Sequence, residues 1–208
     1  MDERSEGILS EVPPGRLMPT IQTKAQLMTA SEIDRTLVRL AHEVIDKKDV
    51  SERLAVIGIH RRGAVLGERL SDKISQLSRH KVACGSLDIN LYRDDLSTVA
   101  DHPIVSGGEI PFAIDDLDVI LVDDVLYTGR TAQSALCSLL ARGSPRTIQL
   151  CTLIDRGHRE LPIEGRFVGK YVDTSISEII EVKLASIDGE ERVLLLEKRI
   201  KDPGSQHM

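Results

Sequence analysis

The segment from residue 119 to residue 131 constrains the fold of this chain more than any other. It begins with an apolar run, residues 119–122, of the kind that forms a strand buried on both faces of a parallel sheet. The run stops at two adjacent carboxylates, Asp123 and Asp124, and a loop with threonine and glycine then leads into helix-forming residues. Strand, polar loop and helix in this order are the repeating unit of an open α/β sheet.

The loop after the carboxylates is suited to an anion. Its backbone N–H groups and the hydroxyls of Thr128 and Thr131 lie at a predicted helix start, where the helix dipole favours negative charge. Gly129 lets the backbone approach a ligand closely. The two carboxylates can accept hydrogen bonds from hydroxyl groups or bind Mg²⁺. A ligand with a phosphate at one end and sugar hydroxyls in the middle, such as a phosphorylated ribose, fits both halves of the segment.

Each half of this pattern has an ordinary explanation when it is taken alone. Paired carboxylates can lie solvated at the end of a strand, and a threonine or glycine can simply cap a helix. The phosphoacceptor aspartate of a receiver domain also follows a buried strand, but no phosphate-binding loop comes after it. The combination of buried run, acid pair and cap therefore favours the ligand site.

Apolar periodicity places the other elements of the sheet around this segment. Thr29 and Glu32 have the spacing of a capping box before a helix that continues to Ile45. An antiparallel hairpin is expected from residues 179–184 and 192–196. We expect helices at residues 33–45, 64–77 and 131–141 and strands at residues 54–59, 82–91, 119–122 and 147–154. These elements predict an α/β fold with one open, mostly parallel sheet flanked by helices and with ligands at the carboxyl ends of the strands.

The chain is predicted to form one domain between two tails. Residues 1–20 are polar and contain several prolines, so we expect a disordered tail there, and residues 201–208 are expected to form a mobile one. Residues 21–200 then form a single domain. Within it, residues 92–117 are polar and interrupted by glycine and proline, and a loop of this length is usually mobile or functional.

Bulk composition limits what such a domain can do. The 208 residues carry 27 basic and 33 acidic side chains, a net charge of −6, and only 2% aromatic residues. This balance argues against a protein built mainly to coat nucleic acid and against base stacking on aromatic platforms. The cysteines Cys84, Cys137 and Cys151 have no metal-ligand spacing and are expected to be reduced thiols. The sequence has neither an apolar run of bilayer length nor an apolar signal core, so we expect a cytoplasmic protein without membrane contact.

Residues 119–131 resemble the phosphoribosyl-pyrophosphate (PRPP) binding motif of type I phosphoribosyltransferases. The form Asp-Asp-Val-Leu-Tyr-Thr-Gly-Arg is similar to that of the PyrR family, which are bifunctional pyrimidine-operon attenuators and uracil phosphoribosyltransferases. Four further stretches resemble the family in the same order, at residues 40–43, 58–63, 88–96 and 155–163. The resemblance implies the type I phosphoribosyltransferase fold, with a small hood and a flexible loop over the site.

The resemblance also implies roles for the residues around PRPP or UMP. Asp123 and Asp124 orient the ribose hydroxyls and hold Mg²⁺, directly or indirectly, and Arg93 on the flexible loop meets the leaving pyrophosphate. Arg156 and the backbone near Val168 are expected to face uracil. The residues expected to bind PRPP or UMP are His60, Arg61, Arg62, Gly63, Asp123, Asp124, Val125, Leu126, Tyr127, Thr128, Gly129, Arg130 and Thr131.

A second activity is implied by the same resemblance, namely UMP- or UTP-dependent binding of a stem-loop in pyrimidine-operon leader mRNA. The residues expected on the RNA face are Arg39, His42, Lys47, His158, Arg159 and Lys170. Two positions depart from the family. Arg61 stands where threonine is more frequent, and Glu164 stands where arginine is frequent and where an acid would repel RNA. The family also forms dimers and tetramers, so a homo-oligomer is expected.

The expected reaction is transfer of the phosphoribosyl group from PRPP to uracil, which gives UMP and diphosphate, with Mg²⁺ as the cofactor. Two alternatives stay open from the sequence. The chain could be an RNA-binding, nucleotide-sensing protein with weak or no transferase activity, or it could be a transferase for a purine base or orotate.

Overall fold

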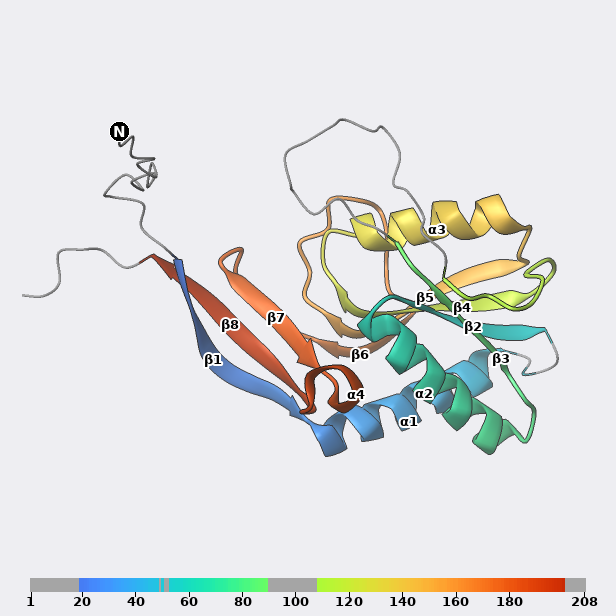
Figure 1. Ribbon diagram of the computed structural model, residues 1–208, viewed down its shortest axis with the longest axis horizontal. Coiled ribbons are helices and arrows are strands. Elements are labelled where there is room, and N and C mark those ends of the chain that lie inside the picture. Colours follow the sequence, from blue (N-terminus) through green and yellow to red (C-terminus); the bar gives the residue numbers. More distant parts are fainter. Residues whose placement is uncertain (1–18, 49, 51–52, 90–107, 201–208) are drawn as a thin grey trace, which may run out of the picture.

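The computed structural model describes residues 19–48, 50, 53–89 and 108–200, and two sheets run through this part of the chain (Figure 1). The larger sheet is parallel, with the strand order β3-β2-β4-β5-β6. Its strands are β2 (Leu54–Ile59), β3 (Ala83–Leu87), β4 (Asp118–Leu126), β5 (Thr147–Asp155) and β6 (Phe167–Tyr171). The predicted open parallel sheet is therefore confirmed.

Helices cover both faces of this sheet. α1 (Ala30–Lys47) and α2 (Arg62–Ser78) lie on one face, and α3 (Arg130–Arg142) lies on the other (Figure 1). α1 begins as predicted with a complete capping box, in which the backbone N–H of Thr29 donates to the Glu32 carboxylate at 2.8 Å. None of the helices in the described ranges is long and apolar enough to span a bilayer.

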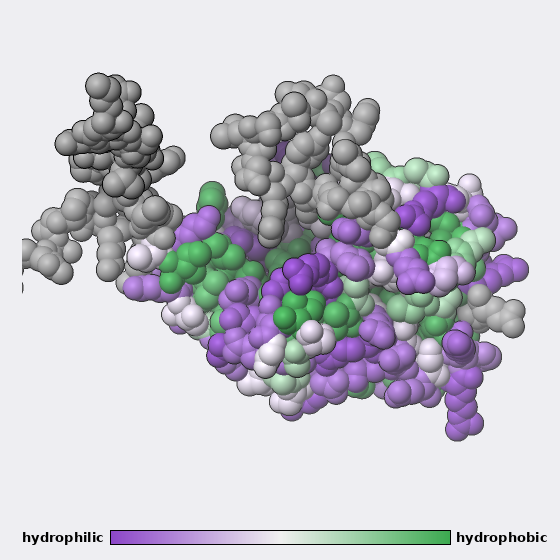
Figure 2. All heavy atoms as spheres, viewed as in Figure 1, coloured by the Kyte–Doolittle hydropathy of each residue, from purple (hydrophilic) through white to green (hydrophobic). Residues whose placement is uncertain are grey.

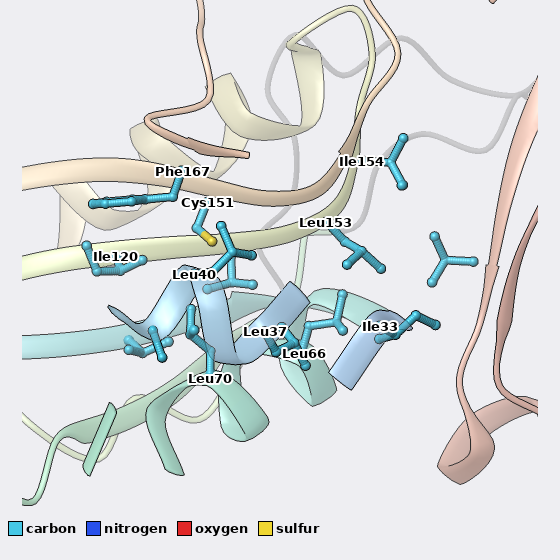
Figure 3. Close-up of a cluster of buried hydrophobic side chains, with 14 of the residues drawn as sticks. Ile33, Leu37, Leu40, Leu66, Leu70, Ile120, Cys151, Leu153, Ile154 and Phe167 are labelled. Carbon is cyan, nitrogen blue, oxygen red and sulfur yellow. The ribbon is translucent and has the colours of Figure 1, made fainter. Parts of the chain in front are cut away.

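Alternating side chains of the central strand bury two hydrophobic clusters. Ile120 and Val122 of β4 belong to the cluster under α1 and α2, whereas Val119 and Leu121 belong to the cluster under α3. In the first cluster, side chains of α1 and α2 meet those of β4, β5 and β6, and Phe167 is fully buried (Figure 3). The sheet thus lies between two apolar layers, which leaves the ends of its strands for polar chemistry.

The smaller sheet is antiparallel and forms the expected hood. Its strands follow the order β1 (Pro19–Thr29), β8 (Arg192–Ile200) and β7 (Glu178–Lys183), and the short helix α4 (Ala185–Asp188) joins β7 to β8. The hydrophobic cluster of α1 continues into this sheet through residues such as Val182. The hood therefore shares a core with the larger sheet, and apolar surface gathers over it on the face drawn in Figure 2.

The structure corrects the predicted end of the central strand. β4 does not stop before the acid pair but continues to Leu126, so Asp123 and Asp124 lie within a strand rather than after it. β3 ends at Leu87, and residues 90–91 of the strand predicted at this place lie outside the described part of the chain. The acid pair is consequently held more firmly than a loop would hold it.

Two strands, β1 and β6, correspond to no strand predicted from the sequence. Pro19 and Thr20, which were assigned to the amino-terminal tail, are the first residues of β1. Residues 1–18 and 201–208, the remainder of the predicted tails, lie outside the described residues, and so does the predicted flexible loop up to residue 107, with Arg93.

Candidate active site

The carboxyl ends of β2, β4 and β5 lie side by side because these strands are parallel neighbours. Three segments far apart in sequence meet there: residues 60–63 after β2, the acid pair of β4 with its following turn, and the loop after β5. Gly63 touches β4 directly, since a Cβ atom on it would lie 2.5 Å from the carbonyl oxygen of Val122 and 3.1 Å from Cα of Asp123. Only glycine fits this contact.

The acid pair is short of positive charge. Asp123 is only 7% exposed, Asp124 is partly buried, and the Asp124 backbone N–H donates to Oδ1 of Asp123 at 2.9 Å. Burial raises the pKa of Asp123 well above its ordinary value, and the charge of Asp124 raises it further. Burial also raises the pKa of Asp124, although the Asp123 hydrogen bond and the charge of Arg62 oppose the rise. A hydroxyl donor or a cation bound here would relieve this imbalance.

Arg62 is the cation whose charge acts on Asp124 of the pair. Its side chain is 31% exposed, and its Nη2 donates to Oδ1 of Asp188 in the hood at 2.8 Å. Its Nε is buried and has no hydrogen-bond partner among the described residues. A buried donor without a partner costs about 1–3 kcal/mol, and an anionic ligand would satisfy it.

His60 and Arg61 stand at the head of the same loop. The His60 backbone N–H donates to the carbonyl of Leu87 at 2.8 Å, and its Nε2 lies 2.9 Å from the hydroxyl oxygen of Ser86. The peptide bond between His60 and Arg61 is cis, and the Arg61 side chain is exposed. The loop is thus fixed to β3 on one side and, through Gly63, to β4 on the other.

The turn after β4 presents an open helix start. Gly129, with φ of +92°, is the N-cap of α3, and no side-chain hydrogen bond caps this helix. The Arg130 backbone N–H makes only a long contact with the Thr128 hydroxyl, at 3.4 Å. Leu161 and Ile163 pack behind the turn, because a Cβ atom on Gly129 would lie 3.5 and 3.4 Å from their Cβ atoms. The uncapped N–H groups favour an anion, as the sequence predicts.

Arg159 holds this turn in place. Its guanidinium donates to the carbonyl oxygens of Tyr127 at 2.8 Å and Ile163 at 2.9 Å, and it forms an ion pair with Asp155 at the end of β5. Its side chain is 22% exposed. Arg159 was predicted to contact RNA, but in the structure its donors are used inside the protein.

Arg156, a predicted uracil contact, is also used internally. It is 6% exposed, its Nε donates to the Thr174 hydroxyl at 3.1 Å, and its Nη2 donates to the Ser175 carbonyl at 3.0 Å. Its guanidinium carbon lies 4.2 Å from the centre of the Tyr127 ring, a cation–π contact. The same Tyr127 ring also meets the ring of His158 edge-on, with the ring centres 5.9 Å apart. Arg156 therefore links the turn after β4 to residues 174–175.

Val168 lies inside the sheet rather than at its loop edge. It pairs with Thr152 of β5, and its carbonyl oxygen accepts a hydrogen bond from Arg39 at 3.1 Å. The same nitrogen of Arg39 donates to the carbonyl of Gly169 at 2.6 Å. Recognition of uracil by the backbone near Val168 stays a prediction.

The predicted RNA residues fall into two groups. Arg39 and Lys170 line a groove of about 330 Å³ between α1, β1 and β6, and Arg35, which the sequence analysis did not assign to this face, joins them. Lys170 donates to the Leu27 carbonyl at 3.0 Å. His42 is exposed on α1. The complete lining is Leu27, Met28, Glu32, Arg35, Thr36, Arg39, Gly169 and Lys170. Three cations and one carboxylate line this groove, and Arg39 also forms an ion pair with Glu43 on the same helix.

The second group is His158 and Arg159, and Arg159 lines a pocket of about 440 Å³ with the opposite character. Three carboxylates, those of Asp155, Glu164 and Asp173, face a single arginine there. Nε2 of His158 lies 2.6 Å from the Thr174 carbonyl oxygen, so this ring is also engaged internally. Lys47, at the end of α1, lies with its Nζ 5.4 Å from the centre of the Phe167 ring and 3.9 Å from the Glu43 carboxylate. The six predicted RNA residues therefore do not form one uniformly basic surface.

A parallel sheet with an acid pair and an anion site at its carboxyl edge defines a phosphoribosyltransferase, and the phosphoribosyl transferase domain family matches residues 25–187. The chain is 50% identical over 174 residues to the bifunctional protein PyrR of Pelotomaculum thermopropionicum. The aligned residues cover 84% of this chain and 96% of that protein. It is 51% identical to the PyrR protein of Deinococcus radiodurans over 84% of this chain and 95% of that one. The chain belongs to the PyrR family of phosphoribosyltransferases.

Solved structures agree on the fold. A hypoxanthine phosphoribosyltransferase from Staphylococcus aureus superposes with a TM-score of 0.64 and 19% identity over 89% of this chain and 95% of that chain. The hypoxanthine phosphoribosyltransferase of Trypanosoma cruzi gives a TM-score of 0.67 and 15% identity, with 84% and 92% covered. The predicted type I phosphoribosyltransferase fold and the resemblance to the PyrR family are both confirmed.

Replacement of Arg159 by alanine is expected to destabilise the protein by about 1–3 kcal/mol, because it leaves Oδ2 of Asp155 and the Tyr127 carbonyl without the Arg159 donor. The turn after β4 should loosen as well, which would raise the KM for PRPP. Thermal unfolding and initial-rate kinetics measure the two effects. Arg130→Ala is the stability control, because its ion pair with Glu160 is largely exposed and contributes little. Equal stability of the two variants would refute the assignment.

Proposed function

We propose that the chain transfers the phosphoribosyl group of PRPP to uracil and also binds pyrimidine-operon leader mRNA in response to uridine nucleotides. One observation carries the transferase proposal. A buried acid pair, an orphan arginine donor and an uncapped helix start converge on one sheet edge. These three features match the hydroxyls, the pyrophosphate and the 5′-phosphate of a single donor molecule.

In the reaction, uracil N1 attacks C1′ of the ribose while the bond from C1′ to the pyrophosphate oxygen breaks. The N1 proton is released, and the products are UMP and diphosphate. Asp123 and Asp124 accept hydrogen bonds from the ribose hydroxyls, and the turn at Thr128 and Gly129 holds the 5′-phosphate. Arg62 meets the pyrophosphate. A role for Arg93 in closing the site stays a prediction, since this residue lies outside the described part of the chain.

Mg²⁺ is the proposed cofactor, and the residues present fit it. Among the described residues, no group of three or more His, Cys, Asp or Glu side chains could hold a metal ion. The acid pair supplies two carboxylates, and Mg²⁺ is commonly bound by one or two carboxylates together with substrate oxygens and water. Asp123 and Asp124 would therefore hold it. When bound, the ion neutralises charge that develops on the leaving diphosphate.

Uracil is the proposed base because residues 155–163 follow the PyrR pattern and because relatives about half identical in sequence carry that name. The Arg156 side chain is engaged with residues 174–175, so we assign it to supporting the base site rather than to reading the base alone. The two carbonyls and one N–H of uracil can be recognised by backbone groups of this loop.

The transferase proposal is tested by incubating the protein with PRPP, Mg²⁺ and one labelled base. Uracil should yield labelled UMP, whereas hypoxanthine and orotate should yield no nucleotide above background. If only hypoxanthine or orotate yielded a nucleotide, uracil would be refuted as the substrate and that base would take its place. The absence of any product, with RNA binding retained, would favour a nucleotide-sensing RNA-binding protein.

The basic groove between α1 and β6 supports the second activity. Its cations suit phosphate groups of an RNA stem-loop, whereas the acidic pocket beside Arg159 does not. We therefore place the RNA backbone on the groove. Uridine nucleotides would act from the neighbouring sheet edge.

Arg39→Gln and Lys170→Gln should each weaken binding of the leader RNA by about 3–10-fold and lower the salt dependence of the affinity by about one unit of slope. Transferase activity should be unchanged. Arg142→Gln is the matched control, because Arg142 is an exposed arginine on α3, at the opposite face of the sheet. Affinity is measured at several salt concentrations with and without UMP. Equal losses in all three variants, or identical affinity for scrambled RNA, would overturn the groove assignment.

A homo-oligomer is also proposed. Exposed large apolar side chains occur on several elements, among them Ile21 of β1, Leu140 of α3 and Ile176 before β7. A dimer or tetramer would cover such positions. Gel filtration with and without UMP distinguishes these states from a monomer. Because the proposed substrates and RNA are cytoplasmic, we place the protein in the cytoplasm.

A further inference from the structure

Two ion pairs attach the turn of the hood to α2. Arg62, at the first position of the helix, pairs with Asp188 at 2.8 Å. Arg69, two turns further along, pairs with Glu191 at 2.9 Å. Both contacts join α2 to the segment between β7 and β8, but only the first involves a residue of the proposed pyrophosphate site.

The Asp188 carboxylate is fixed in orientation. Its Oδ2 accepts the backbone N–H of Leu184 at 2.9 Å, and its Oδ1 accepts Nη2 of Arg62. The side chain is 19% exposed, and Gly189, with φ of +72°, ends α4 immediately after it. Since both oxygens have a donor, the carboxylate is a rigid reference point rather than a mobile surface charge.

The Asp188 carboxylate restrains the guanidinium of Arg62. The group is planar, so holding Nη2 restricts the directions that the Nε–H bond can take. That Nε is the buried donor without a partner. The acid pair is close enough for the charge of Arg62 to act on Asp124.

We propose that Asp188 is a positioning residue for PRPP, which holds Arg62 so that its unpaired donor meets the pyrophosphate group. Asp188 touches no substrate and acts only through Arg62. The inference rests on the proposed transferase function, and it adds the hood to the machinery that binds the donor substrate. The hood is then part of the pyrophosphate site as well as a covering sheet.

A purely structural role for Asp188 predicts something different. If the ion pair served only to dock the hood, then loss of Asp188 and loss of Glu191 would have similar consequences. Glu191→Ala is therefore the matched control, because it removes the other ion pair between α2 and the hood and leaves Arg62 untouched.

The test compares Asp188→Ala, Glu191→Ala, Arg62→Ala and the double variant Arg62→Ala with Asp188→Ala. Asp188→Ala should raise the KM for PRPP by at least about tenfold and leave the KM for uracil within about twofold. Glu191→Ala should leave the KM for PRPP and the KM for uracil within about twofold of the wild-type values. In the Arg62→Ala background, the further loss of Asp188 should have no added effect on PRPP, because the two residues act as one unit.

Asp188→Asn guards against a folding defect. Asparagine has one acceptor oxygen for two donors, so its KM for PRPP should lie between those of the wild type and Asp188→Ala, with unchanged thermal unfolding. Equal effects of Asp188→Ala and Glu191→Ala, or an Asp188 effect that persists without Arg62, would overturn the proposal.

Direct titration separates this inference from the proposed function. Mg²⁺ with inorganic pyrophosphate is titrated into the same variants, which requires no turnover. If the wild-type protein made no UMP, the transferase proposal would fail, while weaker pyrophosphate binding in Asp188→Ala than in Glu191→Ala would still support the positioning role. Equal pyrophosphate affinity in those two variants would refute it.

Discussion

Conversion of both carboxylates to amides, Asp123→Asn with Asp124→Asn, is expected to lower transfer by about 10³-fold or more and yet to raise the stability of the ligand-free protein. The loss of activity follows because amides cannot compensate a cation or accept ribose hydrogen bonds with full charge. The gain in stability follows because burial raises the pKa of both acids in the folded protein.

The gain should depend on pH in a defined direction. An aspartate whose pKa is raised by folding binds more protons in the folded than in the unfolded chain, so stability falls as pH rises through the raised pKa. The double amide variant has no such carboxylates, so it does not lose this stability as pH rises. Its advantage should therefore be small near pH 4 and reach about 1–2 kcal/mol at pH 8. Thermal unfolding at a series of pH values measures it.

Asp118, at the other end of β4, provides the opposite control. It is 2% exposed, and its hydrogen bond with Arg146 lowers its pKa. Its contribution to stability is present above the ordinary aspartate pKa and is lost as pH falls, so Asp118→Asn should destabilise the protein at neutral pH. Undiminished turnover in the Asp123 and Asp124 double variant, or pH behaviour like that of Asp118→Asn, would show that the acid pair has been misassigned.

Replacement of Gly63 by alanine should lower kcat/KM for PRPP by about 10²-fold and destabilise the protein by about 1–3 kcal/mol. The added methyl would lie 2.5 Å from the carbonyl oxygen of Val122, which is backbone and cannot rotate away. α2 must then move off β4, and the loop at residues 60–63 moves with it. Steady-state kinetics and thermal unfolding measure the two effects.

Gly67→Ala is the control for this substitution. Gly67 lies one turn further along α2, and its added methyl would be 3.2 Å from Cα of Gly58, a tight but smaller conflict. This variant should lose some stability and keep its affinity for PRPP. A Gly63→Ala protein that binds PRPP normally would exclude the close contact with β4 as a determinant of the site.

The elements that were predicted well are those whose signal is local. The strand Leu54–Ile59 was predicted with its exact ends, because all six residues are buried and polar residues flank them. The start of α1 followed from the capping box at Thr29 and Glu32. The turn before α3 was predicted for the same reason, since a glycine with threonines before a helix is a local pattern, and its binding of phosphate stays a prediction.

The elements that were missed depend on tertiary contacts. β1 exposes nearly all its side chains and buries Met28 near its end, so it has no alternating pattern to detect. β6 is only five residues long and contains Gly169, whose place is dictated by the carbonyl of Leu153, 2.4 Å from where a Cβ atom would be. Neither feature can be inferred from neighbouring residues.

Side-chain roles were the hardest to predict. RNA binding by Arg159 stays a prediction, and no local pattern indicates that one of its partners is a carbonyl 32 residues earlier in the chain. Arg62 lies at the sheet edge, and its role in the site stays a prediction; its partner Asp188 is 126 residues away. The Asp-Gly turn that contains Asp188 gives a hairpin signal and no hint of this partnership.

The position of Arg39 has a consequence for how the protein behaves at high concentration. β6 is the outermost strand of the larger sheet, and Arg39 occupies two of its main-chain acceptors, those of Val168 and Gly169. Carbonyl groups without a hydrogen-bond donor on an edge strand can pair with a strand of another molecule. An RNA phosphate that binds Arg39 would remove its hydrogen bonds to the Val168 and Gly169 carbonyls. Glutamine at position 39 is too short to form them, so the carbonyls would stay without this donor. The Arg39→Gln variant should therefore aggregate at a lower protein concentration than the Lys170→Gln variant.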